Sequence, residues 1–177
     1  MRLWNAIKAA ASGVEDDGSF DSPEGPDDCE KRRAAAFRVR AEELALADDW
    51  GSRPYGVVLE IHGSRGVTTI IAFATGESSL LLHASGSGMI GRPSHVHVVT
   101  EAKRLVKEAA RHVSSLHPAT SFSYPPPGSA RFYVLTSQGV LTHEEAVGPL
   151  RAGESPLAPL MEAGDELMSE FLQYFYR

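Results

Sequence analysis

The sequence has a single cysteine, Cys29, among 177 residues, so no disulfide can form within the chain. Asp27, Asp28 and Glu30 surround it, and their negative charge disfavours the thiolate that a nucleophile needs. The N-terminus lacks the apolar stretch of about 7 to 15 residues that marks a secretory signal. These absences predict a cytoplasmic protein whose cysteine is neither a crosslink nor a catalytic thiol.

Long hydrophobic runs and an excess of basic residues are also missing. No window approaches the roughly 18 consecutive apolar residues of a membrane span, so none is expected. The net charge is −6, and residues 12–29 hold seven acidic side chains with no Lys or Arg. The rest of the chain is close to neutral, and the basic residues within 31–40 have this acidic stretch as their neighbour. Nucleic acid is therefore not an expected partner.

The length and the hydrophobic content of 42% predict one domain with an ordinary core, residues 30–177. Residues 12–29 are rich in Gly, Ser, Pro and Asp and predict a flexible acidic linker. Residues 1–11 form a short amphipathic peptide, which docks on another molecule or packs back onto its own domain. Its apolar side would carry Leu3, Trp4, Ile7, Ala10 and Ala11.

Hydrophobic periodicity predicts an α+β fold. Short turns between the first three strand candidates require an antiparallel meander, because a parallel crossover needs a dozen or more residues. The expected architecture is a two-layer sandwich with a single, largely antiparallel sheet of about five strands, in the order α-β-β-β-α-β-β-α. The expected elements are a helix over 30–50, strands over 55–62, 67–74 and 78–84, a helix over 94–116, a hairpin of 131–135 with 140–142, and a last helix after Ser155-Pro156.

The run Gly86-Ser87-Gly88-Met89-Ile90-Gly91 spells G-x-G-x-x-G after an apolar segment and before a helix. A dinucleotide site also needs a βαβ unit, a helix that starts within the glycines, and an acidic residue at the end of the next strand. This sequence supplies none of the three. Two interpretations remain: a loop whose glycines shape the backbone, or an anion-binding loop beside Arg92 and the helix N-terminus.

Histidines form the second constellation. In a meander, His62 and His83 would reach the same edge of the sheet, and His95 and His97 would begin the helix that leaves it. Two histidines two positions apart point in different directions on a helix, so no metal site is predicted. A triad of serine, histidine and Glu60 lacks the G-x-S-x-G elbow, so no catalytic residue is assigned. The ligand-binding candidates are Gly86, Ser87, Gly88, Gly91, Arg92, His83 and His95.

Three segments carry a resemblance: FYVLTSQGVLT, SGSGMIG and SPLAPL. They resemble a family of small bacterial proteins with a glycine-rich G-G-G-x-I-G loop and a similar hairpin, over about residues 54–175. The resemblance implies no activity and no catalytic residue. The order of elements is also similar to the profilin, longin and roadblock folds, although these place the long middle helix after two strands rather than three.

These observations predict a non-enzymatic protein-binding or scaffolding module that uses its N-terminal peptide as a tethered contact and can associate with itself. The aromatic end FLQYFYR is more typical of a core or dimer contact than of a ligand site. The expected partner-binding residues are Leu3, Trp4, Ile7, Phe175 and Tyr176. The alternative is an anion, nucleotide or enzymatic site formed by the Gly86–Gly91 loop and the nearby histidines. No cofactor is predicted.

Overall fold

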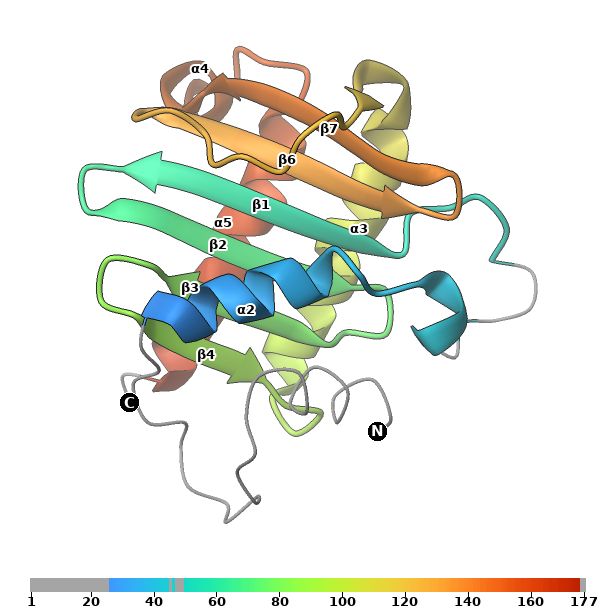
Figure 1. Ribbon diagram of the computed structural model, residues 1–177, viewed down its shortest axis with the longest axis horizontal. Coiled ribbons are helices and arrows are strands. Elements are labelled where there is room, and N and C mark those ends of the chain that lie inside the picture. The colour runs from blue at the N-terminus through green and yellow to red at the C-terminus, as the bar shows by residue number, and fades with distance from the viewer. Residues whose placement is uncertain (1–25, 45, 47–49, 176–177) are drawn as a thin grey trace.

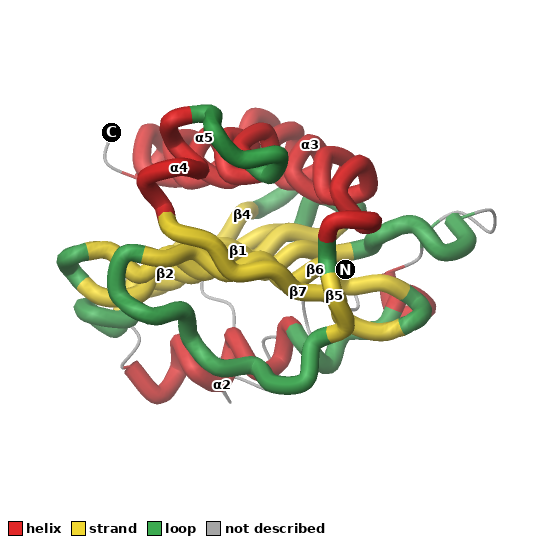
Figure 2. Tube along the Cα trace, turned by 90° about the horizontal axis from the view of Figure 1, so that it is seen from above, coloured by secondary structure: helices red, strands yellow, loops and turns green. Residues whose placement is uncertain are grey.

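The computed structural model describes residues 26–44, 46 and 50–175. In this part of the chain, one antiparallel sheet of seven strands lies between helices on both faces (Figures 1 and 2). The strands are β1 (Gly56–Gly63), β2 (Gly66–Phe73), β3 (Ser78–Leu82), β4 (Ser87–Gly91), β5 (His117–Pro118), β6 (Ser129–Thr136) and β7 (Gly139–Ala146). The helices are α2 (Pro26–Ala36), α3 (Val96–His112), α4 (Val147–Ala152) and α5 (Ala158–Phe175), with the 3-10 turns η1 (Ala41–Leu44) and η2 (Val113–Ser115).

The sheet has the strand order β4-β3-β2-β1-β6-β7-β5. Tight turns produce the neighbouring pairs: Gly66 follows the β1–β2 turn with a φ of 95°, and Gly139 opens β7 with a φ of 124°. Such positive angles favour glycine, which has no Cβ to clash with the backbone. Because β1 pairs with both β2 and β6, it lies at the centre of the sheet.

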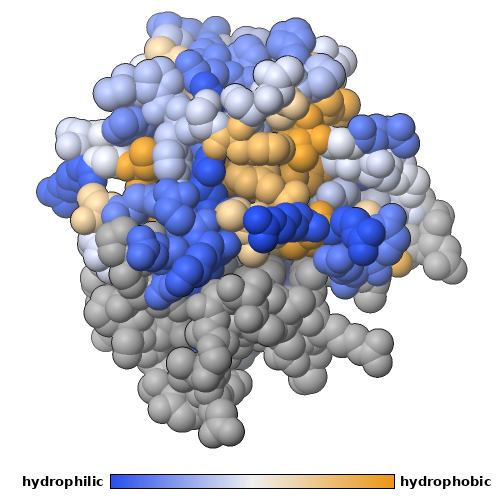
Figure 3. Space-filling view, viewed as in Figure 1, coloured by the Kyte–Doolittle hydropathy of each residue, from blue (hydrophilic) through white to orange (hydrophobic). Residues whose placement is uncertain are grey.

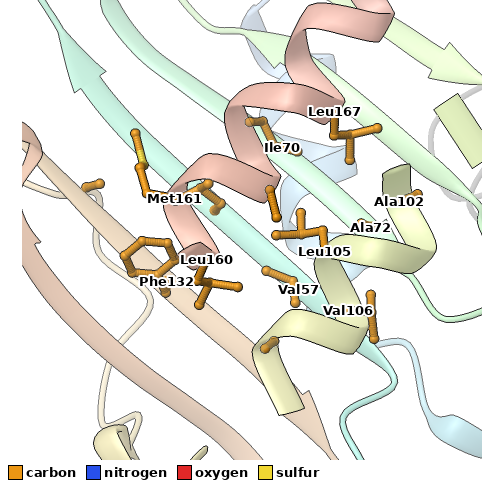
Figure 4. Close-up of a cluster of buried hydrophobic side chains, with 14 of the residues drawn as sticks. Val57, Ile70, Ala72, Ala102, Leu105, Val106, Phe132, Leu160, Met161 and Leu167 are labelled. Carbon is orange, nitrogen blue, oxygen red and sulfur yellow. The ribbon is translucent and has the colours of Figure 1, made fainter. Parts of the chain in front are cut away.

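One face of the sheet carries the main core. Alternate residues of β1, including Val57 and Leu59, point to this face and pack under α3 and α5 (Figure 4). The amphipathic pattern expected for the middle helix is present, since the apolar stripe of α3 is buried at Val98, Ala102, Leu105, Val106 and Ala109. Gly164 lets α5 approach closely, because a Cβ at this position would collide with the side chain of Leu59.

The opposite face carries α2 (Figure 2), and a smaller apolar cluster lies there. The sheet contributes residues such as Val58 and Tyr133, whereas α2 contributes only Cys29 and Ala36 to the buried apolar set. In the middle of this face Glu60 is fully buried. A polar group in that position needs a hydrogen-bonding or charged partner.

The α+β class and the single antiparallel sheet are confirmed, but the count of about five strands and the order of elements are wrong. The glycine run forms a fourth meander strand, β4, because Gly86 closes a tight turn with a φ of 65°. The two residues of β5 are too few to show a period, and α4 follows β7 directly. Helices also cover both faces, so the architecture has three layers instead of two (Figure 2).

The helix expected over 30–50 is shorter and begins earlier. It starts at Pro26, so the last four residues assigned to the acidic linker are helical, and a proline is well tolerated in a first turn. It ends at Ala36, after which Val39 is buried and its carbonyl accepts a hydrogen bond of 2.9 Å from the Tyr55 hydroxyl. The peptide 1–11 and linker residues 12–25 lie outside the described residues. No helix in the described part combines the length and the hydropathy of a membrane span.

Candidate functional site

A buried ion pair connects α2 to the centre of the sheet. Glu60 lies on β1 with its side chain fully buried, and Arg33 on α2 is nearly as buried. The guanidinium binds both carboxylate oxygens, through Nε to Oε1 and through NH2 to Oε2 at 3.1 Å. The same NH2 group donates a hydrogen bond of 2.6 Å to the carbonyl of Phe122. This bidentate geometry fixes both the position and the direction of the arginine.

Further polar side chains extend the pair into a network. Thr69 on β2 lies 3.4 Å from Glu60 Oε1 and 2.9 Å from Nε2 of His83. The hydroxyl of Tyr124 lies 3.3 Å from Nδ1 of His83 and also donates to Glu30 on α2. The Arg33 guanidinium stands over the Tyr124 ring, 4.1 Å from its centroid. Five segments, which are α2, β1, β2, the residue after β3 and the loop that holds Phe122 and Tyr124, therefore meet at one polar cluster.

Burial dominates the electrostatics of this network. It raises the pKa of Glu60, against the hydrogen bonds and charge of Arg33. It lowers the pKa of His83, against the charge of Glu30. It raises the pKa of Tyr124, and the hydrogen bond to Glu30 acts in the same direction. Burial also disfavours the charge of Arg33, but Glu60 outweighs it, so the pKa of Arg33 is raised. The groups stabilise one another where little water can reach them.

The sequence held one signal for this network. Glu60 interrupts an apolar strand, GVVLEIHG, and a buried carboxylate requires a cationic or hydrogen-bonding partner. The partner is Arg33, one of the basic residues at 31–33 that were expected to have the acidic stretch 12–29 as their neighbour. Tyr124 and Thr69 gave no comparable signal, because tyrosine and threonine are ordinary in loops and strands.

The predicted glycine loop is largely a strand, which corrects its assignment. Ser87–Gly91 pairs with β3, and the Ser87 carbonyl lies 3.6 Å from the Sγ of Cys29. Gly91 has a packing role: an added Cβ would lie 2.5 Å from Ser78 Oγ and 2.9 Å from Val98 Cγ1. The absence of a side chain therefore lets α3 pack against this edge of the sheet, in agreement with the backbone interpretation of the glycines.

The four histidines expected near the glycine run lie in two places: His62 and His83 do reach the same edge of the sheet, on either side of Val67, but His95 and His97 do not join them. In the β3–β4 pair, Leu82 lies opposite Ser87 and Ser78 lies opposite Gly91. His83 follows Leu82, whereas Arg92 and His95 follow Gly91, so the length of β4, about 16 Å, separates them. His62 lies at the same end of the sheet as His83, with its Nδ1 2.8 Å from the Pro125 carbonyl. Among the residues that the structure describes, no group of three or more His, Cys, Asp or Glu side chains could hold a metal.

Arg92 and His95 lie near a cavity where α3 begins and α5 ends, which we call the α3–α5 pocket. It has a volume of about 440 Å³ and is lined by Ser94–Val98, Glu170, Gln173 and Tyr174. The His95 ring is buried, 3.8 Å from the Tyr174 ring centroid, and its Nδ1 lies 3.3 Å from the Arg92 amide. Burial lowers the pKa of His95, and the charge of Arg92 acts in the same direction.

Two exposed apolar side chains belong to this pocket. Val96 is 65% exposed and Tyr174 is 46% exposed. They are two of the three large hydrophobic residues exposed in the described ranges, and the third is Phe122, at 43%. The first turn of α3 holds no acidic residue, and its N-cap residue makes no capping side-chain hydrogen bond. The pocket thus combines apolar surface with the positive end of a 17-residue helix.

Phe122 belongs to the face that carries α2. It packs on Phe37, with ring centroids 4.5 Å apart, and on Tyr133 at 5.7 Å. Figure 3 shows hydrophobic residues gathered in the middle of this face beside strongly polar ones. Phe37, Ala119 and Val140 are only partly buried there. Phe122 thus has aromatic neighbours on which to pack.

A wider cavity of about 750 Å³ lies between α4 and α5. Its one arginine, Arg151, makes a bidentate pair with Asp165 at 2.9 and 2.7 Å. Because this arginine already has a carboxylate partner within the chain, the cavity offers less to an anionic ligand than its size suggests.

Most of the residues expected to bind a partner lie outside the part of the chain that the structure describes. Leu3, Trp4, Ile7 and Tyr176 lie outside the described residues, and Phe175 is the last residue of α5. Comparison of the chain with protein-family models, with curated proteins and with solved structures found no match in any of the three.

Proposed function

We propose that this protein is a non-enzymatic binding module that docks a protein partner at the α3–α5 pocket. The observation that carries the proposal is the position of Val96 and Tyr174, two exposed apolar side chains that line one cavity. Apolar surface with a polar rim is typical of interaction sites, and an aromatic side chain at the centre of a pocket is a common hot spot.

The chemistry of the walls indicates the kind of partner. Val96 and Tyr174 would contact an apolar anchor residue. The N-terminal end of α3 holds no acidic residue in its first turn, but Glu170 of α5 lines the same cavity, so the walls favour no charge of one sign. We therefore propose a partner segment that presents an apolar side chain.

The other candidate sites support this proposal less well. In the polar network, Glu60 is bound by Arg33, and His83 contacts Thr69 and Tyr124, so these groups are occupied with one another. The glycine run offers little to a nucleotide, because Ser87–Gly91 is paired as a strand and His83 is separated from Arg92.

The test compares two exposed apolar positions in the full chain. Proteins captured by crosslinking from a cell extract are compared between the wild type, Val96→Glu and Phe122→Glu, and the partner that depends on Val96 is then purified and titrated by calorimetry. We expect Val96→Glu to weaken its binding at least tenfold, whereas Phe122→Glu, a matched change on the other face, leaves binding intact. Equal binding by wild type and Val96→Glu would contradict the proposal, and so would a loss confined to Phe122→Glu.

A further inference from the structure

We infer that the partner of the α3–α5 pocket is a second copy of this chain, and that the two copies pair through the surface formed by α3 and α5. The inference rests on the proposed function, since it names the partner of the same pocket. It adds an arrangement, a two-fold dimer in which α3 of each copy lies over α5 of the other.

The helices α3 and α5 lie side by side on one face of the sheet (Figures 1 and 2). They run in opposite directions, because the start of α3 and the end of α5 line the same pocket. Their apolar sides are buried in the main core. Their other sides are exposed at Lys103 and Lys107 on α3 and at Glu162 and Glu166 on α5. We call this outer surface the helical layer.

Helix α3 brings an excess of positive charge to the helical layer. Arg104 and Arg111 pair with the glutamates three positions before them, at 3.1 and 2.7 Å. Lys103 and Lys107 have no ion pair with any described residue. Four positions separate these lysines, so they share one side of the helix and form a basic stripe.

Helix α5 brings the opposite charge and contains no Lys or Arg. Asp165 is bound by Arg151 of α4. Glu162, Glu166 and Glu170 have no ion pair within the part of the chain that the structure describes. An acidic stripe on α5 therefore lies beside the basic stripe on α3.

The charge pattern selects one orientation of two copies. A two-fold axis parallel to the helices places each α3 over the α5 of the other copy, so that unlike stripes meet twice. An axis across the helices would place α3 on α3 and α5 on α5, with like charges opposed. In the first arrangement the positive end of each α3 also meets the negative end of an α5, whose last turn holds no basic residue.

The spacing along the helices fits the same arrangement. Lys103 lies seven residues after Val96, and Glu166 lies eight residues before Tyr174. If Val96 contacts Tyr174 of the second copy, Lys103 and the second copy's Glu166 both lie about 10–12 Å from that contact, at 1.5 Å per residue. The lysine and the glutamate one turn further along repeat this match. Each copy thus supplies the apolar anchor proposed for the pocket of the other.

The size of the helical layer suits a reversible dimer. Its helices have 17 and 18 residues and are about 25–27 Å long. Together they form a strip about 20 Å wide, so each copy contributes a flat area on the order of 500 Å². Stable interfaces bury about 800 Å² of accessible surface per partner. We therefore expect a dimer that dissociates on dilution and at high salt.

Charge reversal tests the arrangement in the full chain. One variant combines Lys103→Glu with Lys107→Glu, and the other combines Glu162→Lys with Glu166→Lys. In sedimentation velocity we expect the wild type to dimerise and each variant alone to have a dissociation constant raised at least tenfold, because like charges then meet twice. An equimolar mixture of the two variants should recover the dimer, because both contacts then join unlike charges.

The matched control reverses two exposed cations away from the helical layer, Lys31→Glu on α2 and Arg65→Glu in the β1–β2 turn. It should dimerise as the wild type does. A wild type that stays monomeric at its highest soluble concentration would overturn the inference. A mixture of the two charge-reversed variants that associates no better than either one alone would overturn it as well.

The inference and the proposed function fail in different ways. If the wild type is monomeric while Val96→Glu loses a captured partner, the second copy is the wrong partner and the binding function stands. If the two charge-reversed variants pair but Val96→Glu dimerises and captures proteins as the wild type does, the helical layer is a dimer interface and docking at the pocket is wrong. Where both hold, Val96→Glu should raise the dissociation constant of the dimer at least tenfold.

Discussion

The sheet face under α3 and α5 is held by apolar contacts, whereas the face under α2 is arranged around a buried ion pair. On the first face, residues such as Phe132, Leu160 and Leu167 are fully buried in one continuous core (Figure 4). On the second, Arg33 and Glu60 lie between the helix and the sheet. Apolar burial is non-directional, but a bidentate ion pair forms in a single geometry.

This difference indicates two roles. The apolar face supplies most of the stability, at about 25 cal/mol for each Å² of apolar surface removed from water. A buried ion pair contributes less on balance, because desolvation of the two charges offsets their attraction. The ion pair fixes the position of α2, because Arg33 can bind both carboxylate oxygens of Glu60 only when α2 lies in one place on the sheet.

The largest loss of stability is expected from a substitution in the apolar face. Phe132→Ala should lower the free energy of unfolding by about 3–5 kcal/mol, because it removes a fully buried ring and leaves a cavity. Denaturant titration followed by circular dichroism measures the change. A loss below about 1 kcal/mol would show that this face is less closely packed than its burial implies.

The second largest loss of stability is expected from a substitution that breaks the ion pair. Arg33→Met should destabilise the protein by about 3 kcal/mol at pH 7, since it leaves the Glu60 charge buried without its partner. Burial raises the pKa of Glu60, so the native state takes up a proton more readily than the unfolded chain. The loss in this variant should therefore shrink as the pH falls toward 4.

The double variant Arg33→Met with Glu60→Met sharpens the comparison. Two apolar side chains of suitable size should restore most of the stability that the single variant loses. Denaturant titration of the wild type, of the two single variants Arg33→Met and Glu60→Met, and of the double variant gives the coupling energy between the two residues. If the double variant is as unstable as Arg33→Met alone, the ion pair adds to the free energy of unfolding and does more than fix the position of α2.

The smallest effect is the pH dependence from His83. Burial lowers the pKa of His83 in the native state, below the value of about 6.5 in the unfolded chain. The stability it contributes is complete above that value and is lost as the pH falls through the native pKa. The free energy of unfolding should thus differ less between pH 7.5 and pH 5.5 in His83→Gln than in the wild type. An equal difference in both proteins would assign the pH dependence to other groups. His95 is among them, because burial also lowers its pKa.

Much of the fold could be predicted from local patterns. The strands β1, β2 and β3 lie in the expected windows because their side chains alternate between the two faces, and α3 shows its buried stripe at helical spacing. The strand β4 could not be predicted, since its glycines carry little strand propensity and it forms only by pairing with β3. The network was also out of reach, because Arg33, Glu60 and Tyr124 are far apart in sequence and nothing local indicates which arginine turns inward.

The sequence by itself determined the elements that bury a periodic apolar surface. Only the tertiary structure decided that Glu60 is buried and pairs with Arg33, that His83 and His95 lie at opposite ends of β4, and that Val96 and Tyr174 meet at one pocket. The physical reason is the range of the forces. Periodicity and turn chemistry act over a few residues, whereas an ion pair or a pocket depends on distances that exist only after the strands have paired.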